Sequence, residues 1–198
     1  MAVLVTGGAR SGKSSFAEQY AMRVAARGIY IATCQPYDQE MSERITIHQR
    51  DRTDTGYSWE TLEVPYDAAE WLHQIDKELS QDAAVADGKK PAVVLLDCLT
   101  LWLTNWLMRI EHEALDASRL EIEISKLLDG IQSFTHPLLI VTNEVGDGIV
   151  PAYPLGRLFR DEAGRLNQRV AAICERVFLV TAGIPIELKA HAFRWEQL

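Results

Sequence analysis

Residues 7–14 are the segment with the clearest chemical meaning. Their sequence, Gly7-Gly8-Ala9-Arg10-Ser11-Gly12-Lys13-Ser14, matches the phosphate-loop pattern G-x-x-x-x-G-K-[ST]. Glycines allow the backbone N–H groups of such a loop to point at phosphate oxygens, and the N-terminus of a following helix adds partial positive charge. In this pattern Lys13 contacts the β- and γ-phosphates, and the Ser14 hydroxyl binds Mg²⁺. We therefore predict that this segment binds a nucleotide.

Asp97 is a second candidate for phosphate chemistry. It ends the apolar run Val93-Val94-Leu95-Leu96. A carboxylate at the end of a strand near a phosphate loop can hold Mg²⁺ through water. The same side chain could instead cap the helix that follows. The residues alone leave both roles open.

His48 lies among arginines in the segment from Asp38 to Arg52. If this segment is a helix, one face carries Met41, Ile45, His48 and Arg52, with Arg44 one turn before the histidine. Neutral imidazole can attack phosphorus, and Arg44, Arg50 and Arg52 could neutralise a triphosphate. On composition alone, an ordinary helix-face histidine among solvated arginines is the simpler interpretation.

The rest of the chain alternates between strand and helix patterns. Near-continuous apolar runs, typical of strands covered on both faces, lie at residues 3–6, 29–33, 93–97, 138–142 and 177–181. Apolar residues recur at helical spacing over 68–79, 120–134 and 159–173. This alternation predicts one α/β domain over residues 1–198, with a mostly parallel central sheet flanked by helices. We also predict a surface loop at 80–91 and a possible antiparallel edge strand at 186–188.

Polar side chains end four of the predicted strands. They are Thr6, Thr33, Asp97 and Thr142. Ligands of open α/β sheets bind outside the carboxyl ends of the strands. We therefore expect these four residues to gather along one crevice.

Composition limits the class of partner and the compartment. Twenty Lys and Arg against 28 Asp and Glu give a net charge of −8 and a pI of about 5.1, which argues against nucleic-acid binding. Cys34, Cys98 and Cys174 show no C-x-x-C spacing, so we expect neither a disulfide framework nor a zinc site. With no predicted signal peptide or membrane span, we expect a cytoplasmic protein.

Two other clusters allow several interpretations. The segment Leu99–Leu107 is apolar nearly all round, which is typical of a helix buried in a core or a subunit interface, and it could also form one wall of a large ligand site. Five arginines follow further along the chain, at positions 157, 160, 165, 169 and 176. They could form an anion site or a solvated helix face.

Taken together, these motifs resemble the bifunctional adenosylcobinamide kinase / adenosylcobinamide-phosphate guanylyltransferase family of cobalamin biosynthesis. The ordered blocks that carry the resemblance span nearly the whole chain, at residues 6–15, 30–33, 40–52, 59–63, 95–107, 141–151 and 159–171. The resemblance implies a RecA-like P-loop fold and a homotrimer with the corrinoid in a groove between subunits, which would give the helix that carries Trp102 and Trp106 a subunit-interface role.

The resemblance also implies two reactions. In the first, a nucleoside triphosphate, ATP or GTP, phosphorylates the aminopropanol hydroxyl of adenosylcobinamide. In the second, GTP guanylylates a histidine, pyrophosphate leaves, and GMP passes to the cobinamide phosphate to give adenosylcobinamide-GDP. His48 matches the histidine that carries GMP.

Further site residues follow from the same match. The family pattern places Gly7, Gly8, Ala9, Arg10, Ser11, Gly12, Lys13 and Ser14 on the phosphates, Ala32, Thr33 and Cys34 beside the nucleotide, and Gln49, Arg50, Asp51 and Arg52 next to the histidine. Glu63 and Asp97 complete the set. A carboxylate can accept the N1–H and N2–H of guanine together, and Glu63 is the candidate for that role. Asp97 and Ser14 are the candidates for Mg²⁺, and Asn143, Glu144 and Arg160 join the site by resemblance alone.

The two reactions make conflicting demands on one site. A phosphate loop presents the γ-phosphate, whereas guanylylation requires attack at the α-phosphorus. The nucleotide must therefore bind in two poses, or His48 must move about a hinge at residues 35–37. A P-loop kinase of another alcohol, or a RecA-like nucleotide-switched binding module, remains an alternative, although the net charge of −8 disfavours a module for DNA.

Overall fold

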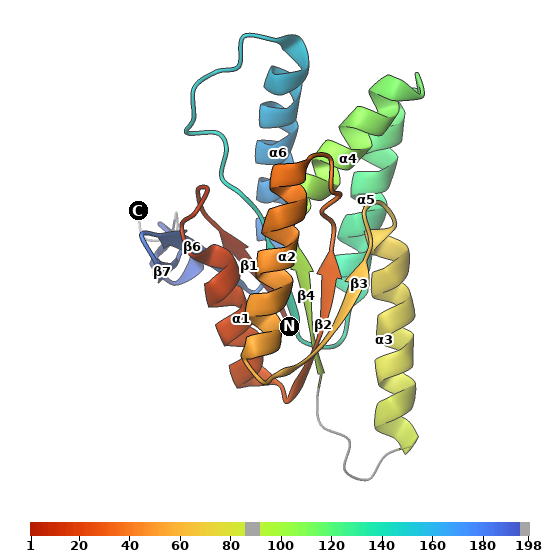
Figure 1. Cartoon of the computed structure of the whole chain (residues 1–198), viewed down its shortest axis with the longest axis vertical. Coiled ribbons are helices and arrows are strands. Elements are labelled where there is room, and N and C mark those ends of the chain that lie inside the picture. Colours follow the sequence, from red (N-terminus) through yellow and green to blue (C-terminus); the bar gives the residue numbers. More distant parts are fainter. Residues whose placement is uncertain (86–91, 195–198) are drawn as a thin grey trace.

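A seven-stranded sheet with the order β3-β2-β4-β5-β1-β6-β7 forms the centre of the computed structural model, which describes residues 1–85 and 92–194 (Figure 1). The strands are β1 (Ala2–Thr6), β2 (Arg27–Ala32), β3 (Ser58–Glu63), β4 (Ala92–Asp97), β5 (Leu138–Val141), β6 (Arg176–Thr181) and β7 (Ile184–Glu187). All neighbouring strands pair in parallel except β6 and β7. The predicted parallel sheet and its antiparallel C-terminal edge are confirmed.

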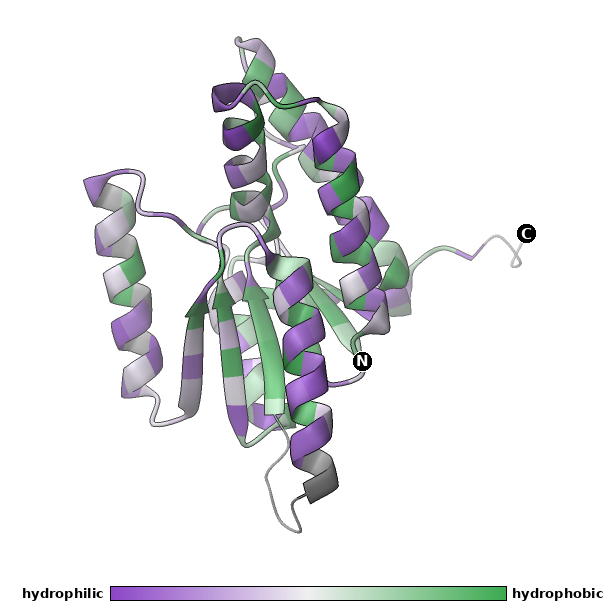
Figure 2. Ribbon diagram, turned by 90° about the vertical axis from the view of Figure 1, so that its right-hand side faces the viewer, coloured by the Kyte–Doolittle hydropathy of each residue, from purple (hydrophilic) through white to green (hydrophobic). Residues whose placement is uncertain are grey.

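Helices cover both faces of this sheet. They are α1 (Lys13–Val24), α2 (Gln39–Asp54), α3 (Ala68–Val85), α4 (Leu99–His112), α5 (Ser118–Ser133) and α6 (Pro154–Ile173), followed by a short 3-10 helix, η1 (Lys189–His191). Successive strand residues point to opposite faces. Val3 and Val5 therefore pack in the same cluster as Ala17 of α1, whereas Leu4 packs in the cluster that α3, α4, α5 and α6 complete. Strands β1, β4 and β5 are accordingly apolar except for Thr6 and Asp97 at the ends of β1 and β4, and green predominates along strands of the sheet in Figure 2.

Two expectations about the elements were wrong. Strand β3 was not predicted, because it pairs with one neighbour only and its residues, SWETLE, are largely exposed. Helix α3 continues to Val85, so the first half of the predicted loop at 80–91 is helical. Arg27 contacts Asp82 at 3.4 Å and ties the last turns of this helix to the start of β2. Residues 86–91 lie outside the described residues.

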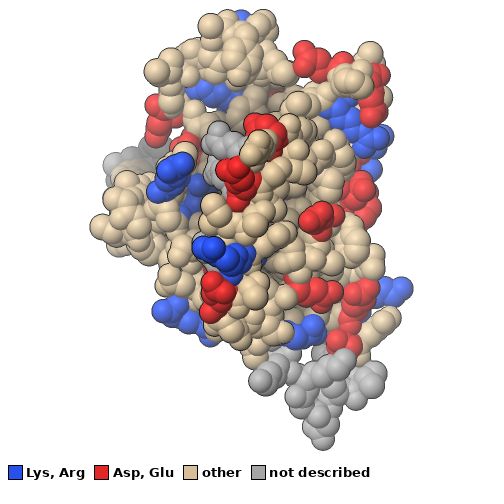
Figure 3. All heavy atoms as spheres, viewed as in Figure 1, with Lys and Arg blue, Asp and Glu red and all other residues tan. Residues whose placement is uncertain are grey.

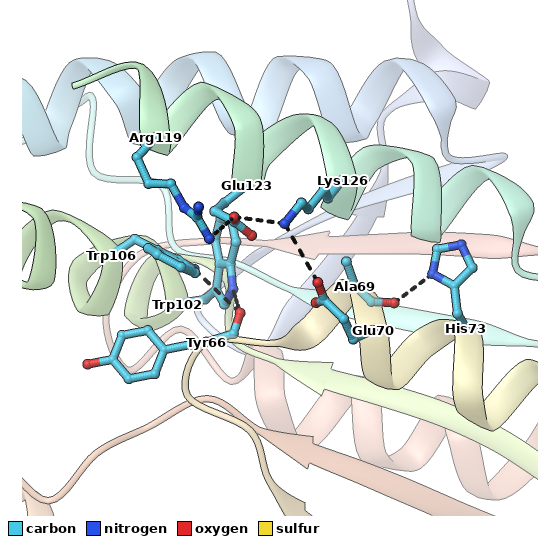
Figure 4. A network of polar contacts seen from close by, with 9 residues as sticks. All are labelled: Tyr66, Ala69, Glu70, His73, Trp102, Trp106, Arg119, Glu123 and Lys126. Atoms are coloured by element: carbon cyan, nitrogen blue, oxygen red, sulfur yellow. Dashed lines mark hydrogen bonds and ion pairs between the residues drawn. The ribbon is translucent and has the colours of Figure 1, made fainter. Parts of the chain in front are cut away.

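Helix α4 is part of the core of a single chain. Its Trp102 and Trp106 side chains are only 1% and 2% exposed, and both indole Nε1 atoms donate to the Tyr66 carbonyl oxygen, at 2.7 and 3.4 Å (Figure 4). The core interpretation of this segment is confirmed. The protomer's own residues already cover these two indoles, and a subunit-interface role for the helix as a whole stays a prediction. Within the described residues, no helix is long and apolar enough to cross a membrane.

The arginines of α6 have separate partners rather than a common anion site. Arg157 donates to the carbonyl oxygens of residues 151 and 152, and Arg160 donates to that of Gly146. Arg165 pairs with Glu162, and Arg169 contacts Glu121 at 2.9 Å. On the face seen in Figure 3, basic side chains are interspersed with acidic ones.

Candidate functional site

The phosphate loop connects β1 to α1. Gly12, which immediately precedes α1, has φ +93°, a left-handed conformation that glycine adopts without strain. At Gly7 the constraint is space, because a Cβ there would lie 2.4 Å from the Val180 carbonyl oxygen of β6. Lys13 is only 8% exposed, and its Nζ donates to the Gly8 carbonyl oxygen at 3.1 Å. The loop is therefore fixed against the sheet, with its lysine folded over its own backbone.

A cavity of about 670 Å³ opens beside this loop, at the carboxyl ends of the central strands. The strand registers place three of its lining residues side by side, because Ala32 pairs with both Glu63 of β3 and Asp97 of β4. Twelve of the predicted site residues line the cavity: Ala9, Arg10, Lys13, Ser14, Ala32, Cys34, Gln49, Arg52, Glu63, Asp97, Asn143 and Glu144. Segments far apart in the sequence thus meet where strand-end ligand sites occur in open α/β sheets.

Asp97 is held by an aromatic side chain. The Tyr30 hydroxyl donates to Asp97 Oδ2 at 2.8 Å. Burial, together with the charge of Asp97, raises the pKa of Tyr30 well above 10.0, so this hydroxyl remains a donor at neutral pH. The arrangement fixes one carboxylate oxygen of Asp97 and leaves its other oxygen for further interactions.

Arg52 covers the other side of Tyr30. Its guanidinium carbon lies 3.7 Å from the centre of the Tyr30 ring, and its Nη1 lies 3.8 Å from Glu18 Oε1 on α1. Because Arg52 is only 5% exposed, this stacking takes place out of water, where cation–π contacts are strongest. The contact attaches the C-terminal end of α2 to the sheet and to α1.

Helix α2 forms one wall of the cavity. Asp38 caps it by accepting a hydrogen bond from the Met41 N–H at 2.7 Å. Met41, Ile45 and Arg52, three of the four residues predicted to share a face, all line the cavity. His48 lies on this helix, but the side chains of Arg44, His48 and Asp51 lie outside the described residues. Arg50 is exposed and is not part of the lining.

The other predicted residues of the phosphate loop, and Thr33, are not part of the cavity lining. Gly7, Gly8, Ser11 and Gly12 belong to the backbone of the phosphate loop and are not in the lining. Thr33 is fully buried, and its hydroxyl donates to the Cys98 carbonyl oxygen at 2.8 Å and accepts from the Cys98 N–H at 2.9 Å. The Thr33 side chain therefore joins the ends of β2 and β4.

The predicted crevice of four polar strand ends forms only in part. Asp97 lines the cavity, whereas Thr6, Thr33 and Thr142 are buried. The Thr142 hydroxyl donates to Asn167 on α6 at 2.7 Å. A single polar residue at a strand end does not reveal whether it points into the crevice or toward a neighbouring helix.

Several lining residues had no individual prediction. Tyr30, Thr100, Leu101, Thr104 and Phe159 line the cavity with the predicted residues. Two features of the sequence pointed toward the site. Tyr30 is an aromatic residue with a hydroxyl in an otherwise aliphatic strand, and residues 99–107 could form one wall of a ligand site. Thr100 and Thr104 lie one turn apart on α4 and give that helix a polar edge beside Asp97.

Comparison with known proteins decides the family. The model of the family described as cobinamide kinase / cobinamide phosphate guanyltransferase matches residues 3–188. The chain belongs to this family. The resemblance inferred from the ordered motifs is confirmed.

Relatives of this cobinamide kinase family member share its length. It is 39% identical to the bifunctional adenosylcobalamin biosynthesis protein CobP of Pseudomonas aeruginosa, covering 95% of this chain and 97% of the relative. It is 40% identical to the bifunctional adenosylcobalamin biosynthesis protein CobU of Salmonella typhimurium, covering 96% of this chain and 100% of the relative.

Among solved structures, this member of the cobinamide kinase family is similar to an ATPase from the type III secretion system of pathogenic bacteria. The TM-score is 0.52 at 9% identity, over 98% of this chain and 59% of the ATPase chain. The likeness concerns the fold alone and supports the RecA-like P-loop architecture.

The residues around Asp97 fit a magnesium ion. Ser14 and Asp97 both line the cavity, and their hydroxyl and carboxylate oxygens are ligands that Mg²⁺ accepts. Among the described residues, no cluster of three or more His, Cys, Asp or Glu side chains could enclose a metal. In P-loop sites, the nucleotide phosphates and water supply most of the magnesium ligands.

Proposed function

We propose that the protein phosphorylates adenosylcobinamide on its aminopropanol hydroxyl and then transfers GMP from GTP to the product through His48. The observation that carries this proposal is the single cavity lined by the phosphate loop, Asp97 and α2. Family membership gives the two reactions their substrates.

Phosphate binding falls to the loop and to the start of α1. Backbone N–H groups of residues 7–14 receive the phosphate oxygens, and Lys13 leaves the Gly8 carbonyl to contact the β- and γ-phosphates. Ser14 and Asp97 would hold Mg²⁺, and the bound ion would supply positive charge beside the phosphates. Asp97 enters this role already oriented by Tyr30.

Guanine would bind at the end of the cavity away from the phosphate loop. Glu63 lies at the end of β3, the edge strand, and lines the cavity. Its carboxylate can accept both N1–H and N2–H of guanine, a pairing that adenine cannot make. The order of the strands therefore separates the base, near β3, from the phosphates, near β1.

Histidine guanylylation requires His48 to reach the α-phosphorus. Imidazole nitrogen attacks there, pyrophosphate leaves, and GMP stays on the ring until the cobinamide phosphate displaces the histidine. We propose that α2 moves about residues 35–37 between the two reactions. In the structure, the Tyr37 hydroxyl donates to Asn105 Oδ1 of α4 at 2.6 Å and is the contact such a movement would break.

The test of this mechanism is labelling with GTP carrying a radioactive α-phosphate. A GMP–histidine bond is a phosphoramidate, so the protein adduct should be labile in acid and stable in alkali. His48→Ala should abolish the adduct. His73→Ala is the matched control, because His73 lies on α3 with its Nδ1 2.8 Å from the Ala69 carbonyl oxygen.

Three outcomes separate the parts of the proposal. No adduct on the wild-type protein would reject the guanylyltransferase reaction, and an adduct that survives in His48→Ala would reject His48 as its site. Transfer of a γ-label from nucleotide to adenosylcobinamide tests the kinase separately. Crystals with and without a GTP analogue that placed His48 far from the α-phosphorus in both would reject the movement of α2.

We further propose a homotrimer, as the family resemblance implies. Exposed apolar side chains on the segment after β5 offer surface for such contacts, with Ile149, Val150 and Tyr153 at 96%, 57% and 63% exposure. A molar mass from light scattering that matches one chain would reject this assembly.

A further inference from the structure

The carboxylate of Glu144 lines the cavity close to the phosphate loop and has no role in the steps described above. Glu144 follows β5, the strand that separates β4 with Asp97 from β1 with the phosphate loop. Its backbone N–H donates to the Gly7 carbonyl oxygen at 3.0 Å, which binds it to the first residue of the loop. Its side chain lines the cavity. A carboxylate is thus fixed beside the place where the phosphates bind.

The orientation of this carboxylate is also fixed. Glu144 Oε1 accepts a hydrogen bond from the Gly146 N–H at 2.8 Å. Gly146 is itself held from the other side, since both Nε and Nη2 of Arg160 donate to its carbonyl oxygen. Within the described part of the chain, Oε2 of Glu144 accepts no hydrogen bond from the backbone or from a side chain. One oxygen therefore positions the group, and the other can accept a proton.

The three carboxylates of the cavity differ in their distance from the phosphate loop along the sheet. Glu63 lies on the edge strand β3, four positions from β1. Asp97, on β4, already accepts the Tyr30 hydroxyl and is proposed to hold Mg²⁺. Glu144 alone among them follows the strand adjacent to β1. Of the three, Glu144 is therefore the carboxylate that follows the strand nearest to the phosphate loop, where a phosphoryl group held by that loop would react.

We propose that Glu144 orients the substrate hydroxyl and accepts its proton during phosphoryl transfer, an inference that rests on the proposed kinase function. The hydroxyl oxygen forms a bond to the γ-phosphorus while the bond from that phosphorus to the β–γ bridging oxygen breaks. The nucleoside diphosphate leaves with that electron pair, and the hydroxyl proton moves to Oε2. In a loose transition state, such a residue acts mainly by holding the nucleophile in line.

Glu144→Gln tests this role with little structural change. The amide oxygen of Gln can still accept from the Gly146 N–H, but the side chain can no longer take a proton. We expect transfer of a γ-label to adenosylcobinamide to fall by about 10²- to 10⁴-fold. Nucleotide affinity should change little, and the α-labelled GMP adduct should still form. Asp147→Asn is the matched control, because Asp147 is an exposed acid of the same segment outside the cavity lining.

The outcomes that overturn the inference differ from those that overturn the proposed function. A Glu144→Gln kinase rate within about threefold of wild type excludes Glu144 as the proton acceptor. Equal losses in phosphorylation, adduct formation and nucleotide affinity would show that Glu144 only supports the loop, which also overturns the inference. A wild-type protein that transfers no γ-label would instead reject the kinase function itself.

Discussion

The Tyr30 hydroxyl donates a 2.8 Å hydrogen bond to Oδ2 of Asp97, so an aromatic residue of β2 fixes the acid at the end of β4. On the same ring, the Arg52 guanidinium of α2 stacks at 3.7 Å. One side chain in the middle of the sheet therefore contacts both the candidate metal ligand and the helix that carries His48.

Tyr30→Phe should weaken the response of nucleotide binding to magnesium. The substitution keeps the ring and removes one hydrogen bond to a charged group, worth about 1.5 kcal/mol, or about tenfold in affinity. We expect this loss for a fluorescent GTP analogue titrated with Mg²⁺ present and little change with EDTA present. Tyr20→Phe is the control, since Tyr20 packs on Phe16 and Phe178 away from the cavity. An unchanged Mg²⁺ response in Tyr30→Phe would contradict the role of the hydroxyl.

Arg52→Ala should loosen α2 from the sheet. It removes the contact with Glu18 and a stacking interaction in a buried position, which together stabilise the fold by about 2 kcal/mol. Arg50→Ala, an exposed position on the same helix, should change stability by less than about 0.5 kcal/mol. Urea unfolding measures both values, and hydrogen exchange should report faster opening of α2 in Arg52→Ala only. Equal stabilities of the two variants would argue against Arg52 as the attachment point.

The sheet could be predicted from the sequence because most of its strands are covered on both faces. Residues 93–97 and 138–142 are almost continuously apolar, so their assignment did not depend on a periodic pattern. Strand β3 gave no such signal, since an edge strand with exposed residues keeps polar side chains. Strand β3 forms because it pairs with β2, and this pairing is a tertiary contact that the local sequence does not show.

The site was predictable where a local motif specifies it. The phosphate loop is a contiguous motif whose predicted ligand contacts come from its own backbone, so a short pattern identifies it in full. Tyr30 and Thr33 differ from this, because their hydrogen bonds depend on Asp97 at the end of β4 and on Cys98 just after it, 67 and 65 positions away. The role predicted for His48 came from the family resemblance, since on composition alone an ordinary helix-face histidine was the simpler interpretation.

Gly7→Ala should destabilise the loop through contact with β6. The new Cβ would lie 2.4 Å from the Val180 carbonyl oxygen and 2.7 Å from Ser11 Oγ, and backbone must move to relieve the first clash. Overpacking of this kind costs about 1–3 kcal/mol. Gly8→Ala is the matched control, because a Cβ at Gly8 has no other atom within 4 Å. Thermal unfolding should separate the two variants, and equal melting temperatures would show that the loop yields without cost.

Cysteine labelling should report on occupancy of the cavity. Burial raises the pKa of Cys174 to about 12, so at pH 8 only about one thiol in ten thousand is the reactive thiolate. Because its pKa is raised, Cys174 becomes more reactive only as the pH rises toward 12, or when the chain unfolds. Cys34 is partly exposed and lines the cavity. Iodoacetamide at pH 8 should therefore modify Cys34 first, as peptide mass spectrometry can measure.

Nucleotide should slow this labelling if it fills the cavity. With Mg²⁺ and GTP near saturation, we expect the rate at Cys34 to fall several-fold while the slow rate at Cys174 stays the same, because Cys174 follows α6 in the core. A Cys34→Ser variant identifies the modified peptide. If GTP does not change the rate of Cys34 labelling, the bound nucleotide lies away from the end of β2. That result would contradict the assignment of residues 32–34 to the nucleotide site.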